Sequence, residues 1–470
     1  PAALRMKTYV DAQMAGGNIY GFEPWFATLV YQATGDTRYA DYAVQRTDAF
    51  VASEEALIAN GQRATVAGDS YLAVGEIIGG LATVYDWAWD RLTPQQRARW
   101  VAYANQAVWN VWNPAAAQWG GQPYPWTGWS INNPANNYYY SFLRATLLLG
   151  LATHGENPQA PTWLTRFRTD KIGNQLIPTF NSQLQGGGSR EGTGYGTAMR
   201  GLWELYDVWE RSTGERIATL TPHTRDSIAH LLHNLVPTLD RLAPTGDHSR
   251  DSTAALFDYH RQYLQTLITL YPQDRLSAVA ASALALSSVP RMRYSYDYFS
   301  DFLYAVPSLP TATLAELSTA YWGPGTGQLM MRSAWDPAAT YANFICGPYT
   351  ESHAHRDQGS FVLFRGNWLA WDGNISSASG IEQGEEQHIL VRLVRADGVE
   401  VRQRAESSPC RLLALAHNEH FTYAVADVTP AYGGAAAPTY GVSRIEREFL
   451  FIRPGTVVVM DRVAGTSSGT

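Results

Sequence analysis

The chain is poor in cysteine and in charge, and each shortage argues against a class of protein. Cys346 and Cys410 are the only cysteines, so a disulfide framework and a cysteine-rich zinc module are excluded, while a single bridge between them stays open. Charged residues make up 16% of the chain and the formal net charge is −7. Because a nucleic-acid-binding protein needs a basic face, this balance argues against nucleic acid as a partner. An anionic sugar is not excluded, since it needs only a local cationic or amide-lined cleft.

The sequence also has no apolar run of membrane-spanning length, which argues against a membrane span. A length of 470 residues is too great for one ordinary core, so two domains are expected. The 16 tryptophans and 27 tyrosines suit a carbohydrate cleft in which flat rings stack on sugars, although most large aromatic residues serve the core. The chain begins at Pro1 without methionine, as after removal of a signal peptide or a tag.

Residues 1–310 have the apolar spacing of helices. In "LTPQQRARWVAYANQAVWNVW", Thr93 and Gln96 form a capping box around Pro94, and apolar residues then recur at helical spacing. "LTPHTRDSIAHLLHNLVPTLDRL" repeats the Thr-Pro opening at Thr221 and Pro222. Further helices are predicted near residues 23–34, 37–57, 69–90, 138–153, 196–213, 256–271 and 275–288. Many antiparallel helix pairs in one domain indicate a bundle, a solenoid or an α/α toroid.

From about residue 320 the pattern changes to strands. "FVLFRGNWLAWDG" predicts a hairpin with a two-residue turn at Gly366-Asn367, and "HFTYAVADV" and "REFLFIRPGTVVVMDRV" add further strands. We therefore expect a helical domain over 1–310 and an antiparallel β domain over 320–470. The chain ends soon after a strand-like run, so the β domain is expected to be incomplete at Thr470.

Three polar stretches in the helical half are candidates for a site. Asn136 and Asn137 precede an apolar helix, where one of them could cap it or present an amide to an anionic group. In "LQGGGSREGTGYG", Tyr195 lies among glycines, where nothing local packs its ring. The stretch "APTGDHSRD" reads as a solvated loop; its polar residues are Asp247, His248 and Arg250.

The stretch "SHAHRDQGSFVLFRGNWLAWDGN" holds the densest cluster. His353 and His355 would share one face if they lay in a strand. Asp372 ends the second strand of the predicted hairpin, and His388 follows in "EEQHILVRLV", which reads as another strand. Two histidines and an aspartate from neighbouring strands could hold Zn²⁺ and leave a position for water.

Taken together, these residues resemble the heparinase II/III-like polysaccharide lyases, a family that includes alginate and heparin lyases. The most specific pieces are "SHAHRDQGSFVLFRGNWLAWDG" and "SREGTGYG", with weaker support from "PTGD" and "EREFLFIRPGTVVVMDRV". The resemblance covers nearly the whole chain in order. It implies an N-terminal α/α toroid of antiparallel helix pairs followed by an antiparallel β-sandwich.

The resemblance also implies roles for individual residues. The catalytic residues would be Asn136, Asn137, Tyr195 and His353; asparagine stands here where a histidine often stands in the family. Substrate-binding residues would be Arg190, Glu191, His248 and Arg250. A structural divalent metal ion, expected to be Zn²⁺, would be held by His355, Asp372 and His388, with His417 or His420 as replacements for His388.

The implied reaction is β-elimination on an anionic, uronic-acid-containing polysaccharide such as alginate, a glycosaminoglycan or a related glucuronan. Such a site must stabilise the substrate carboxylate, remove the neighbouring proton and protonate the leaving oxygen. An imidazole ordinarily titrates near neutrality and a phenol near pH 10, so His353 is the easier base of the two. The substrate class implies a secreted or periplasmic protein.

Two other functions fit the same sequence. A glycoside hydrolase on an α/α toroid would use two carboxylates, with Asp69, Asp86, Glu191 and Asp247 as candidates. A non-catalytic carbohydrate-binding protein would bind the polymer without turnover.

Overall fold

The computed structural model describes residues 2–68, 70–247, 254–372, 384–395, 397–403, 410–433 and 441–465. Packing divides the chain into two compact units. The first unit contains Pro1–Thr179, Ala198–Ile217 and Arg291–Val306, and the second contains Phe180–Thr197, Ala218–Pro290 and Pro307–Thr470. Among the described residues, no helix is both long enough and apolar enough to cross a membrane.

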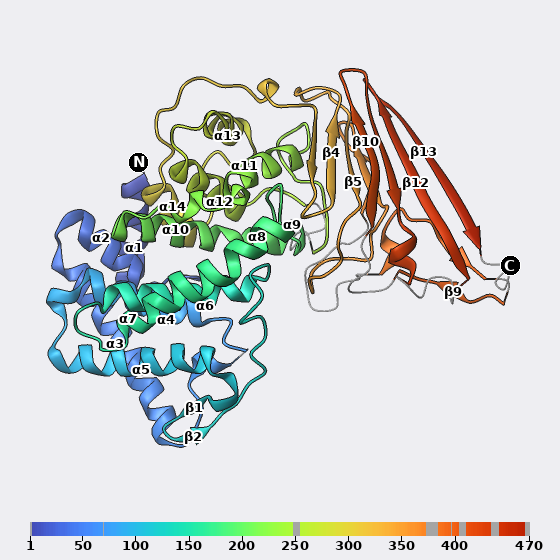
Figure 1. Cartoon of the computed structure of the whole chain (residues 1–470). Coiled ribbons are helices and arrows are strands. Elements are labelled where there is room, and N and C mark those ends of the chain that lie inside the picture. Colours follow the sequence, from blue (N-terminus) through green and yellow to red (C-terminus); the bar gives the residue numbers. More distant parts are fainter. Residues whose placement is uncertain are drawn as a thin grey trace. The chain divides into compact units, whose positions relative to one another are not determined.

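The first unit is helical (Figure 1). Its α-helices are α1 (Ala2–Met14), α2 (Trp25–Thr34), α3 (Thr37–Ala59), α4 (Val74–Trp87), α5 (Pro94–Trp112), α6 (Asn137–Ala152), α7 (Ala160–Thr165), α10 (Met199–Thr213) and α14 (Tyr298–Leu303). Shorter elements are η1 (Thr65–Ala67), η2 (Trp89–Arg91), η3 (Pro114–Ala116), η7 (Ser295–Asp297), the strands β1 (Gln118–Trp119) and β2 (Gln122–Pro123), and a π-helix, η4 (Arg166–Leu176). α8 (Ile177–Gln183) passes from the first unit to the second.

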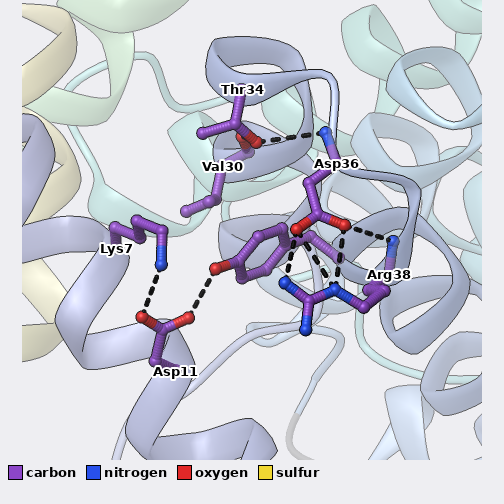
Figure 2. A network of polar contacts seen from close by, with 7 residues as sticks. Lys7, Asp11, Val30, Thr34, Asp36 and Arg38 are labelled. Carbon is purple, nitrogen blue, oxygen red and sulfur yellow. Dashed lines mark hydrogen bonds and ion pairs between the residues drawn. The ribbon is translucent and has the colours of Figure 1, made fainter.

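Polar side chains cap these helices and join them to one another. The predicted capping box of α5 is present, with the Thr93 hydroxyl accepting from the Gln96 N–H. In Figure 2, Lys7 and Asp11 of α1 form an ion pair of 2.7 Å. The other Asp11 oxygen accepts from the Tyr39 hydroxyl of α3 at 2.5 Å, so one carboxylate joins two helices.

The second unit combines short helices with antiparallel sheets. Its helices are α9 (Gly192–Tyr195), η5 (Gly196–Ala198), η6 (Ile217–Thr219), α11 (Pro222–Asn234), α12 (Asp258–Leu270), α13 (Arg275–Leu286), η8 (Leu314–Glu316), η9 (Glu385–Gln387) and η10 (Thr429–Tyr432), of which η5 and η6 end or begin at the border with the first unit. A five-stranded sheet has the order β3 (Ala320–Gly323), β4 (Gln328–Arg332), β5 (Tyr341–Ile345), β6 (Phe361–Phe364) and β7 (Trp368–Ala370). A four-stranded sheet has the order β10 (Arg411–His417), β11 (Phe421–Asp427), β12 (Val442–Ile452) and β13 (Thr456–Gly465), and β8 (Leu393–Val394) pairs with β9 (Glu400–Val401).

The two larger sheets share one apolar core and form a β-sandwich. Phe344 of β5 stacks on Phe449 of β12, with 5.2 Å between the ring centroids. The opposite face of the five-stranded sheet packs Met330 and Tyr341 against Val236, which follows α11. All five residues of β4 and of β5 are therefore buried, and the helices and the sandwich of the second unit are joined through this sheet.

This order of helices followed by antiparallel sheets confirms the predicted fold class, a helical toroid followed by a β-sandwich. The packing division differs from the boundary predicted at residues 310–320, because α11–α13 group with the strands. The boundary at residues 310–320 therefore stays a prediction about domains, and the two compact units are defined by packing alone.

Three local predictions were wrong. The β6–β7 connection has three residues, 365–367, because the pairing shifts register between Leu363 and Phe364. His353 lies in a turn and His355 in the irregular segment after it rather than in a strand, and the Ala354 N–H donates to the Glu351 carbonyl. The stretch after His388 contains only the two-residue strand β8.

Candidate functional site

Three segments of the second unit pack backbone against backbone at the candidate site. They are α9, the loop at 243–247, and the segment between β5 and β6. The Gly194 N–H donates to the Asp247 carbonyl at 2.9 Å, and the Asp247 N–H donates to the His353 carbonyl at 2.8 Å. A Cβ atom on Gly246 would lie 2.7 Å from the His353 carbonyl oxygen, and one on Gly192 would lie 2.5 Å from the Thr245 carbonyl oxygen. Glycine is therefore required at both positions, which also have positive φ.

The Asp247 carboxylate lies between both histidines of the His-x-His motif. Its Oδ2 is 2.7 Å from Nδ1 of His353, and its Oδ1 is 2.8 Å from Nε2 of His355. The side chains of Asp247 and His355 are buried, whereas that of His353 is 22% exposed. The two histidines thus meet the same carboxylate although they do not lie in a strand.

Tyr195 lies flat against His353. The ring centroids are 3.6 Å apart and the planes differ by 12°. Tyr195 is the last residue of the short helix α9, and the N–H of the preceding Gly194 donates to the Asp247 carbonyl. The loop that carries the Asp247 carboxylate therefore contacts the segments of both Tyr195 and His353. A phenol and an imidazole are thereby placed side by side, and both are groups that can transfer protons.

The hydrogen bonds also determine which ring nitrogens face outward. Burial raises the pKa of Asp247, but hydrogen bonds from His353 and His355 outweigh it and hold that pKa below its ordinary value. A carboxylate accepts only, so each histidine donates to it. His353 therefore donates through Nδ1 and directs Nε2 away from the carboxylate, whereas His355 donates through Nε2.

His355, Asp372 and His388 form a buried group suited to a metal ion. One potential ligand atom from each lies within 4.8 Å of the others. Nδ1 of His388 is 3.3 Å from Oδ1 of Asp372, while Nε2 of His388 is buried without a hydrogen-bond partner among the described residues. Two nitrogens and one carboxylate oxygen suit Zn²⁺. The predicted alternatives lie elsewhere: His417 bonds to Thr422 and the side chain of His420 is exposed.

Burial and neighbouring charges act in opposite directions on the pKa values of the side chains around this group. Burial lowers the pKa of His388, but the hydrogen bond to Asp372 and the charges of Asp372, Asp357 and Glu385 outweigh it, so the pKa of His388 is raised. Asp357 is also buried, and burial raises its pKa to about 6 although His388 and His355 oppose the shift.

Asn136 and Asn137 belong to the first unit. Asn136 is the N-cap of α6, and its Oδ1 accepts from the Tyr138 N–H at 3.1 Å. The loop before them is held by Lys171 of the π-helix, whose buried ammonium donates to the Ile131 carbonyl at 2.7 Å and to Asn132 Oδ1 at 2.9 Å. A shared site for these asparagines and Tyr195 stays a prediction.

The residues predicted to bind substrate have different surroundings. Arg190 donates to the Gly325 carbonyl at 2.7 Å and to the Gln183 carbonyl, so its guanidinium ties segments of the second unit together. Glu191 is fully buried, which argues against direct contact with a polymer. His248 and Arg250 lie outside the described residues.

Sequence reasoning named Asp247 only as part of a polar loop and as a carboxylate for the alternative hydrolase, and it missed the role of Asp247 beside the two histidines. Its stretch read as a solvated loop, yet the carboxylate is buried and its partners lie 106 and 108 residues further along the chain. The signal available in the sequence was the "PTGD" stretch, which counted only as weak support for the resemblance.

Solved structures of other proteins share this fold. Heparan sulfate lyase HepC from Pedobacter heparinus superposes with a TM-score of 0.59 at 16% identity, over 94% of this chain and 61% of that one. Heparinase III superposes with a TM-score of 0.62 at 14% identity, over 94% and 62%. The chain has the heparinase III fold.

At such identities the comparison concerns the fold alone. This heparinase III-like chain spans about three fifths of the length of those two proteins. No family model matches the sequence, and no curated protein matches it.

Proposed function

We propose that the chain is a polysaccharide lyase that cleaves a uronic-acid-containing polymer by β-elimination. The observation that carries the proposal is the stacked pair of Tyr195 and His353, with the imidazole held at Nδ1 by a buried carboxylate. The fold shared with proteins named as a heparan sulfate lyase and heparinase III supports the same reaction class. Alginate, glycosaminoglycans and other glucuronans remain the candidate substrates.

The proposed chemistry needs two proton transfers. A base removes the proton on the carbon beside the carboxylate, the bond from the next carbon to the glycosidic oxygen breaks, and a double bond forms between the two carbons. An acid protonates the departing oxygen. Nε2 of His353 and the Tyr195 hydroxyl are the two groups available for these roles, and the stereochemistry at the proton-bearing carbon decides which is base and which is acid. Of the two asparagines predicted to be catalytic, Asn137 is proposed to donate a hydrogen bond to the substrate carboxylate, because Asn136 is buried and caps α6.

The surroundings of the carboxylates favour a lyase over a hydrolase. Asp247 is bonded to two histidines, and Glu191 is fully buried. A hydrolase needs two carboxyl groups that face the scissile bond from both sides. Asp86 lies in the first unit and Asp69 lies outside the described residues, so the described residues of the second unit supply no such pair from among these candidates.

The test of this function is a screen of uronate polymers. A lyase releases products with an unsaturated, ultraviolet-absorbing end. A saturated product with a new reducing end would instead support the hydrolase, and binding without any product would support a carbohydrate-binding protein. We also propose a secreted or periplasmic location, which the Cys346–Cys410 disulfide supports because such bridges persist in oxidising compartments.

The proposed metal ion would be held by His355, Asp372 and His388. Bound there, it would supply a rigid cross-link between the turn of the His-x-His motif, the end of β7 and the segment after η9. Elemental analysis should find about one divalent ion per chain, with Zn²⁺ favoured. His388→Ala should lower that content, while His417→Ala, the matched control on β10, should not. Full retention of metal by the His388 variant would contradict this ligand set.

A further inference from the structure

The contacts of Asp247 reach both halves of the site at once. One carboxylate oxygen holds His353, the proposed proton-transfer residue, and the other holds His355, the proposed metal ligand. Its backbone carbonyl accepts from Gly194 beside Tyr195, and its backbone N–H donates to the His353 carbonyl. We infer that Asp247 is a positioning residue that couples the metal anchor to the Tyr195–His353 pair. This inference rests on the proposed lyase function.

The Asp247 carboxylate orients the rings of both histidines. Because Oδ2 binds Nδ1 of His353, the imidazole is fixed in the orientation that leaves Nε2 outward. Because Oδ1 binds Nε2 of His355, the carboxylate fixes the ring that forms the possible metal group with Asp372 and His388. A carboxylate behind a metal-bound histidine fixes the ring and raises its affinity for the metal. Here the same carboxylate also serves the neighbouring histidine.

Asp247 is too deeply buried to take part in substrate contact, since its side chain is 2% exposed. Its loss should therefore affect the rate of turnover rather than the binding of substrate. An amide at this position has one accepting oxygen and one donating nitrogen, so it can accept from only one of the two histidines. The other ring would face an N–H donor and would rotate or change tautomer.

The deciding variant is Asp247→Asn. We expect kcat to fall by at least about 100-fold with KM changed by no more than about threefold, in the range seen when an orienting carboxylate is lost. We also expect a chromogenic chelator to remove zinc from the variant at least about tenfold faster than from the parent. Asp247→Glu keeps a carboxylate and should recover part of both properties.

The matched control is Thr245→Val, which alters the same loop without touching either histidine. Thr245 accepts a hydrogen bond from the Gln328 side chain and lies 3.1 Å from the Thr193 hydroxyl, so its loss loosens the loop generally. This variant should keep kcat and zinc release within about threefold of the parent. Equal losses in the two variants would reduce Asp247 to a structural role and overturn the inference.

Zinc release separates this inference from the proposed function. If the parent cleaves no uronate polymer yet releases zinc slowly, and Asp247→Asn releases it rapidly, the lyase function fails while the hold of Asp247 on the metal anchor stands. If the parent binds no metal, or if Asp247→Asn retains parental kcat and parental zinc release, the coupling is refuted.

Discussion

Tyr195 meets His353 ring to ring and is only half-buried, so a change of one atom at this position is informative. Tyr195→Phe keeps the stacked ring and removes the hydroxyl. We expect kcat to fall about 10²- to 10⁴-fold, the usual contribution of a proton-transfer group. The free energy of unfolding should change by less than about 0.5 kcal/mol, because little packing is lost. Steady-state kinetics and thermal unfolding check the two expectations, and parental turnover in the variant would remove Tyr195 from the mechanism.

Short motifs predicted part of this site, and long-range contacts supplied the rest. Tyr195 was singled out because glycines surround it, and the His-x-His spacing predicted a common direction for His353 and His355 but no common neighbour. The neighbour itself was not predictable, because Asp247 reaches them across more than 100 residues of chain. The reason given for a common direction was also wrong, since His353 lies in a turn and His355 in the irregular segment after it, and the two meet through the carboxylate rather than along a strand.

Helix α11 carries three buried histidines outside the candidate site. Burial lowers the pKa of His223 to about 4, that of His230 to about 3 and that of His233 to about 4. In the unfolded chain a histidine titrates near pH 6.5. The unfolded state therefore binds more protons than the folded state between about pH 6.5 and pH 3 to 4. The stability from these groups is fully present above pH 6.5 and is lost as the pH falls through that window.

His230→Gln should make the protein less sensitive to acid. The wild-type ring packs against Gly188 and its Nε2 lies 3.1 Å from the Thr326 hydroxyl, so the variant should be less stable at pH 8. Between pH 7 and pH 5, however, its melting temperature should fall less steeply, because one titrating group is gone. The exposed His154 supplies the control variant His154→Gln, which should follow the parent at every pH. Parallel curves for parent and His230→Gln would show that this ring does not contribute to acid lability.

Elements with strong local signals were predicted well. α5 begins at the predicted capping box, and α3 and α13 begin where an aspartate accepts from the backbone, at Asp36 and Asp274. The π-helix η4 was not predicted, and its buried Lys171 makes a contact that local sequence does not indicate, since its ammonium donates to the Ile131 carbonyl 40 residues earlier. Turn residues suggested the β6–β7 hairpin, but its register depends on pairing that turn chemistry does not determine.

The Cys346–Cys410 bridge joins the two sheets of the sandwich. Cys346 directly follows β5 and Cys410 directly precedes β10, and both are buried in the core that the sheets share. The segment between these cysteines, which are 64 positions apart, carries His353 and all three proposed metal ligands. The sequence left this pairing open, because two cysteines far apart in the chain indicate nothing about their distance in space.

Replacing both cysteines by alanine should destabilise the second unit by about 4 kcal/mol, the entropy of closing a loop of this length in the unfolded chain. Alanine is preferred to serine because a hydroxyl buried at these positions would add its own desolvation cost. Denaturant unfolding of the variant should show an earlier midpoint for the transition of the second unit. An unchanged midpoint would mean that the bridge does not constrain the unfolded chain.

Turnover of the same variant, at a temperature where it stays folded, should remain within a few fold of the parent, because the hydrogen bonds among Gly194, Asp247 and His353 hold the site independently of the bridge.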